Sequence, residues 1–135
     1  MEIKEVKITT ASKSGEKKQV SVILGYCFAT EISYKILAEE DINDFIKEAI
    51  ECIDKKKMPD TRKSIFLIVA AMQAYYESIG KKPPLTDKDL MYHMTAAEMG
   101  TAVGTIIGMY IEANKSPKGE VDEQEKKEAD DSKNA

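Results

Sequence analysis

The chain has 135 residues, enough for one ordinary domain, and 42% of them are hydrophobic, which supports a buried core. Its 24 acidic residues outnumber its 20 basic ones, and Arg62 is the only arginine. Nucleic-acid-binding proteins usually concentrate positive charge and grip phosphates with arginine, so we expect no nucleic-acid partner. The longest apolar run, at 65–72, is far shorter than the roughly 20 residues of a membrane helix, so we expect no membrane partner.

The cysteine content indicates a reducing compartment. Cys27 and Cys52 are too few for a disulfide framework, and no apolar leader follows Met1. We therefore expect a cytoplasmic protein in which both cysteines are small buried side chains rather than ligands or nucleophiles.

The first 25 residues carry the pattern of a β-hairpin. Apolar β-branched residues alternate with polar ones on both sides of a polar, glycine-containing loop at 11–16. An isolated hairpin is marginally stable in water, so this one must lie on the helices or pair with another chain.

Helical spacing begins at residue 28, and the first helix is expected to stop near 39–40. The spacing suggests that four apolar residues share one of its faces: Phe28, Ile32, Ile36 and Leu37. Asp41, followed by an acid three residues later, predicts the cap of a second helix with an apolar stripe over 42–53.

The third helix is predicted over 61–79, with Gly80 at its end. It is apolar on every side at 65–72, so it should form the centre of the core. A threonine followed three residues later by an acid predicts two further helix starts, at Thr86 and Thr95.

The last 20 residues differ from the rest in composition. Four lysines and seven acidic residues leave a net charge of −3, and the apolar content is too low to offset the entropy of ordering. We therefore predict a mainly α fold with a short N-terminal β-hairpin. About five helices form a single compact domain over 1–115, followed by a disordered acidic tail at 116–135.

The chain shows little that indicates catalysis. His93 is the only histidine, and Asp89, four residues before it, is typical of a surface ion pair. No nucleophile elbow, phosphate-binding loop or metal-spaced cysteine set is present. We expect no enzyme activity, cofactor or metal.

Glycines recur every four residues in the last helix, at Gly100, Gly104 and Gly108. Each costs about 1 kcal/mol relative to alanine in a helix interior. Close packing against the helix at 61–79 would explain them, and so would a groove that receives a partner segment or a second subunit.

Tyrosines and methionines suggest a second interaction feature, because flexible methionine suits surfaces that accept varied apolar partners, although it also fills cores. The residues expected to contact a partner protein are Tyr75, Tyr76, Met91, Met99, Gly100, Gly104, Gly108 and Ile111.

The order of these segments resembles a known family. A hairpin runs into the segment 24–32, LGYCFATEI, and the segment 41–45, DINDF, opens the second helix. After the long apolar helix comes 85–90, LTDKDL, and then a last helix and a charged tail. Over roughly 18–113 the chain resembles the tail assembly chaperones of long-tailed bacteriophages and their prophage relatives.

The resemblance implies a non-enzymatic chaperone in the host bacterial cytoplasm. Such proteins hold the tape measure protein, and often the tail tube protein, before the tail polymerises, and a longer frameshifted form is common. We also expect self-association through the hairpin or the last helix. The alternatives are a structural tail-completion or adaptor subunit, and an unrelated regulatory interaction module of a mobile element.

Overall fold

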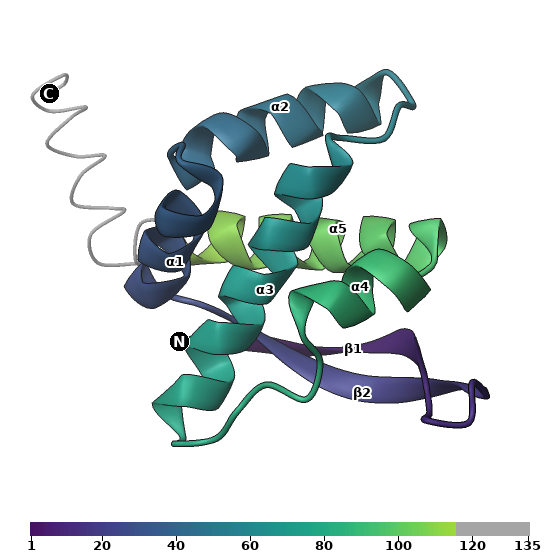
Figure 1. The fold of residues 1–135 in the computed structure, drawn as a ribbon. Helices are drawn as coiled ribbons and strands as arrows, with labels where there is room; N and C mark the ends of the chain where they lie inside the picture. Colours follow the sequence, from purple (N-terminus) through teal and green to yellow (C-terminus); the bar gives the residue numbers. More distant parts are fainter. Residues whose placement is uncertain (116–135) are drawn as a thin grey trace, which may run out of the picture.

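The computed structural model describes residues 1–115, so the predicted acidic tail at 116–135 lies outside the described residues. The elements in chain order are β1 (Glu2–Ala11), β2 (Lys17–Tyr26), α1 (Phe28–Ala38), α2 (Ile42–Asp54), α3 (Thr61–Ser78), α4 (Asp87–His93) and α5 (Ala96–Ala113). The predicted fold, mainly α with an N-terminal β-hairpin and five helices, is confirmed (Figure 1).

The hairpin is a two-stranded antiparallel sheet with one face against the helices. Val6 pairs with Val22, and the two strands stay in register from one end to the other. Alternate side chains are buried, as the period-two pattern predicted. The strands contact α3, α4 and α5, so the hairpin gains its stability from the helices of its own chain.

Helix α3 forms the centre of the core. Its residues at 67–72 are all buried, because neighbours cover it on several sides. In Figure 1 it runs between the hairpin and α2, while α5 crosses behind it. Helix α2 adds Phe45, which is fully buried and contacts the ring of Tyr34 with 5.8 Å between ring centroids. The apolar pattern therefore located the core helix correctly.

Most predicted helix starts are confirmed. The side chains of Thr86 and Thr95 each accept a hydrogen bond from the backbone N–H three residues later, and the acid there returns the bond. Asp60 caps α3 in the same way, because its side chain accepts a hydrogen bond from the Lys63 backbone N–H, but no side chain bonds back to the Asp60 backbone. Asp41 occupies the cap position of α2, but its carboxylate accepts a hydrogen bond from Lys35 Nζ at 3.0 Å instead of capping the helix.

Glu98 joins the start of α5 to the hairpin. Its carboxylate accepts hydrogen bonds from the Thr9 backbone N–H at 2.9 Å and the Thr9 hydroxyl at 2.7 Å, besides its capping bond. Gln19 donates a further bond at 3.2 Å. Partial burial disfavours the carboxylate, but these donors outweigh burial and lower the pKa of Glu98 to about 2.

Candidate protein-binding surfaces

The outer side of α1 carries a row of large apolar side chains without neighbours to cover them. Phe28, Ile32 and Ile36 are 80%, 60% and 72% exposed, and we call these three residues the α1 ridge. They lie four residues apart, so each stands about one helical turn, roughly 6 Å, from the next. Exposed large apolar residues grouped in this way are typical of an interaction surface.

The opposite side of α1 packs on the core. Tyr34 is fully buried, and its hydroxyl donates a hydrogen bond to Glu40 at 2.7 Å. Thr30 is also buried and donates to the Gly25 carbonyl at 2.8 Å, which fixes the rotation of the helix as it leaves β2. Because Tyr34 and Thr30 place this face against the core, the α1 ridge on the other side points away from the body of the domain.

Leu37 does not share the face of the α1 ridge, so the prediction that it lies with Phe28, Ile32 and Ile36 is wrong. Leu37 is partly buried and lines a hollow between α1, α3 and the segment that connects α3 to α4. One residue along an α-helix turns the side chain by about 100°, so Leu37 and Ile36 point in different directions.

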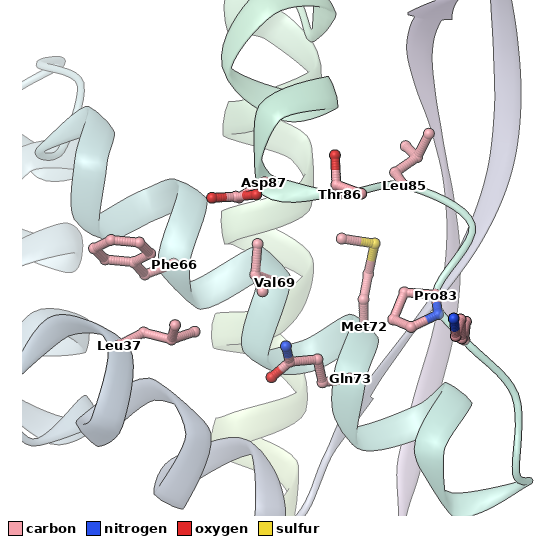
Figure 2. Close-up of a pocket in the computed structure, with 10 residues that line it drawn as sticks. Leu37, Phe66, Val69, Met72, Gln73, Pro83, Leu85, Thr86 and Asp87 are labelled. Carbon is pink, nitrogen blue, oxygen red and sulfur yellow. The ribbon is translucent and has the colours of Figure 1, made fainter.

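That hollow, which we call the α3–α4 pocket, has a volume of about 420 Å³. Figure 2 shows its apolar wall, formed by side chains from α1, α3 and the connecting segment. The apolar lining residues are Leu37, Phe66, Val69, Met72, Pro83 and Leu85. Gln73, Lys82, Thr86 and Asp87 complete the lining, so the pocket is apolar inside with polar groups around it.

A second hollow of about 500 Å³ lies on the other side of Phe66 and Asp87, which line both spaces. It contains Met91, one of the predicted contact residues, which is half exposed. The guanidinium of Arg62 lies over the Phe66 ring at 4.7 Å from the centroid, a cation–π arrangement. Together the two hollows follow α3 along the side that faces α4.

The glycines of α5 face outward. A Cβ atom added at Gly100, Gly104 or Gly108 would meet nothing within 4 Å. Close packing of these glycines on α3 is therefore wrong, because α5 turns Val103, Ile106 and other large side chains to the core instead. The second explanation, a surface that receives a partner, stays a prediction.

The other predicted contact residues fall in different places. Tyr76 accepts a hydrogen bond from the Ile23 backbone N–H at 3.1 Å and so holds α3 to the hairpin, and its ring meets that of Tyr75. Met99 is buried in the core. Ile111 is half exposed near the end of α5. The structure therefore does not gather the eight residues into one surface.

Sequence reasoning missed Phe66 and the orientation of the α1 ridge. The spacing of Phe28, Ile32 and Ile36 was visible, but periodicity alone does not tell whether an apolar face is covered. Phe66 stood within an uninterrupted apolar run, which gave no signal that its side chain would line two surface hollows.

Within residues 1–115, no three His, Cys, Asp or Glu side chains lie close enough together to hold a metal ion. His93 ends α4, with its ring beside that of Tyr92. No helix in the same part of the chain is long and apolar enough to cross a membrane.

Comparisons of the chain with protein-family models, with curated proteins and with solved structures found no match.

Proposed function

We propose that this protein is a non-enzymatic tail assembly chaperone that holds apolar helical segments of a tape measure protein in the α3–α4 pocket. The order of the hairpin and helices, which resembles that family, supports the assignment. The observation that carries it is the pocket itself, an open apolar hollow that remains after the core is complete.

The pocket suits an amphipathic helix. Its volume of about 420 Å³ accommodates one or two large side chains, and the hollow beside Met91 accommodates another. Helices are commonly bound this way, with apolar anchors one turn apart in a groove and polar groups at its edge. Arg62 and Lys82 on one hand, and Asp87 on the other, provide both signs of charge around the opening.

Two methionines allow a matched test. Met91 lines the second hollow, which adjoins the α3–α4 pocket at Phe66 and Asp87. Met58 lies before α3 near Gly100, and both methionines are 52% exposed. The protein is co-expressed with a helical segment of the tape measure protein encoded in the same genome, and the soluble fraction of that segment is measured. We expect Met91→Glu to lower it several-fold and Met58→Glu to leave it unchanged.

The outcomes separate the candidate functions. No gain in solubility with the wild-type chain would refute the chaperone proposal. If Met58→Glu lowers the soluble fraction and Met91→Glu does not, the cargo binds at the glycines of α5 instead. Mass spectrometry of purified virions tests the structural alternative, since a tail-completion subunit stays in the particle and a chaperone is absent from it.

A further inference from the structure

The α1 ridge lies outside the proposed cargo pocket and has a shape of its own. Phe28 and Ile36 stand at equal distances along the helix on either side of Ile32. A row with this symmetry matches itself when a second copy is turned end to end, so that Phe28 of each chain meets Ile36 of the other. Such self-complementary contacts are the rule in twofold dimers.

We propose that the α1 ridge is the interface of a twofold dimer in which the α1 helices of two copies pack antiparallel, with the axis passing beside Ile32. This inference does not depend on the identity of the cargo. It places self-association at α1 rather than at the hairpin or the last helix, the two positions expected from the sequence.

The charges beside the ridge fit this arrangement. Glu31 and Lys35 lie on one flank of the ridge, one turn apart. The twofold axis brings this flank against the same flank of the partner. At about 1.5 Å rise per residue, Glu31 then lies about 3 Å along the axis from both the partner's Lys35 and the partner's Glu31, whereas the two Lys35 residues are about 9 Å apart. At about 100° per residue, Lys35 is turned about 60° from Ile32, which faces the partner, and Glu31 about 100°, so each Glu31 lies nearer to the partner's Lys35 than to the partner's Glu31. Opposite charges are therefore neighbours across the interface.

Both charged groups have a partner within their own chain. The Tyr26 hydroxyl donates a hydrogen bond to the Glu31 carboxylate. Lys35 pairs with Asp41 at 3.0 Å, beside a hollow of about 340 Å³ that Ile32 and Ile36 also line. The Glu31 side chain, which is hydrogen-bonded to Tyr26 before association, loses less entropy when it occurs.

The size of the ridge predicts a weak dimer. Three such side chains offer on the order of 400 Å² per chain, or roughly 800 Å² for the pair. Stable complexes usually bury about 1,200–2,000 Å² in total. We therefore expect a weak equilibrium between monomer and dimer that shifts with protein concentration, as in transient interfaces.

The first experiment uses Ile32, because the axis sets this residue against its own copy. Sedimentation equilibrium of the full chain is run up to about 500 µM, a range set by the expected weak association. Wild type should approach the mass of two chains, and Ile32→Glu and Ile32→Lys should each raise the dissociation constant more than tenfold. An equimolar mixture of the two variants should form a mixed dimer, because glutamate then faces lysine.

A second experiment checks the orientation. In a chain with Cys27→Ser and Cys52→Ser, Ile32→Cys should form a disulfide-linked dimer on mild oxidation, and Met91→Cys should not. Glu31→Lys should weaken association, and adding Lys35→Glu should restore it.

Several results would overturn the dimer. A wild-type chain that stays monomeric at every concentration rules it out. Failure of the Glu and Lys variants to combine would mean that the ridge binds a different surface, such as the glycines of α5. Tape measure solubilisation by Ile32→Glu is scored separately, so failure of the cargo proposal and failure of the dimer give different results.

Discussion

Replacing the exposed glycines of α5 by alanine should stabilise the protein. Gly100, Gly104 and Gly108 are helical, and a Cβ atom at each would contact nothing within 4 Å. Alanine narrows the conformational freedom of the unfolded chain, and no clash opposes it in the folded one. The same change would be harmful if another helix of this chain were packed on the glycines.

The size of the effect follows from the helix alone. Each exposed Gly→Ala change in a helix interior is worth about 0.8–1.0 kcal/mol. The three sites lie one turn apart and share no partner, so their effects should add to about 2.5 kcal/mol. For a domain of this size the melting temperature should rise by about 10 °C.

Urea unfolding followed by circular dichroism measures this gain, with Gly25→Ala as the control. There a Cβ would lie 3.2 Å from Tyr75 Cβ and 2.6 Å from Met1 Sδ, so alanine should destabilise. A loss of stability in Gly104→Ala at low protein concentration would refute the open-face geometry. A gain in stability together with loss of tape measure binding would show instead that the glycines serve a partner.

Three further substitutions test contacts within the fold. The stabilisation from Glu98, whose folded pKa is about 2 against an ordinary 4.5, is present above the unfolded pKa and lost as the pH falls from about 5 to 2. The free energies of unfolding of wild type and Glu98→Gln, measured in urea, should therefore differ by about 1–2 kcal/mol near neutral pH, after allowance for solvent screening, and converge in acid. A difference that does not change with pH would contradict this. Tyr76→Phe leaves the Ile23 N–H without its acceptor and should cost about 1–2 kcal/mol by the same assay, and an unchanged midpoint would mean that water replaces the hydroxyl. Phe45→Ala, at a fully buried position, should cost about 3–5 kcal/mol, and a cost below 1 kcal/mol would be inconsistent with the packing of α2.

The positions of the helices could be predicted because their ends are determined locally. Thr86 and Thr95 carry their capping partners three residues away, so no distant contact is needed to start either helix. The hairpin register likewise follows from alternation and a short loop. The long apolar run in α3 left only the centre of the domain as a place where it could be buried.

The exposure of each face could not be predicted in the same way, because it depends on contacts distant in the sequence. Helix α1 has two faces whose composition is apolar enough to be buried. The face with Tyr34 is the buried one, because the Tyr34 ring contacts Phe45 and its hydroxyl donates a hydrogen bond to Glu40. The α1 ridge is left outside for that reason. The outward orientation of the glycines in α5 could not be decided for the same reason, since periodicity does not show which side a helix turns to the core.

The two proposed surfaces meet at α1 without overlapping. Leu37 forms part of the α3–α4 pocket, and its neighbour Ile36 belongs to the α1 ridge on a different side of the helix. A second copy bound to the ridge would therefore leave the pocket open, and each dimer would present two pockets related by the twofold axis. A long tape measure chain that offers several apolar helices could then occupy both pockets, and the second would bind at the high effective concentration set by the first. Ile32→Glu should accordingly weaken binding of a long segment much more than binding of a short one, whereas Met91→Glu should weaken both.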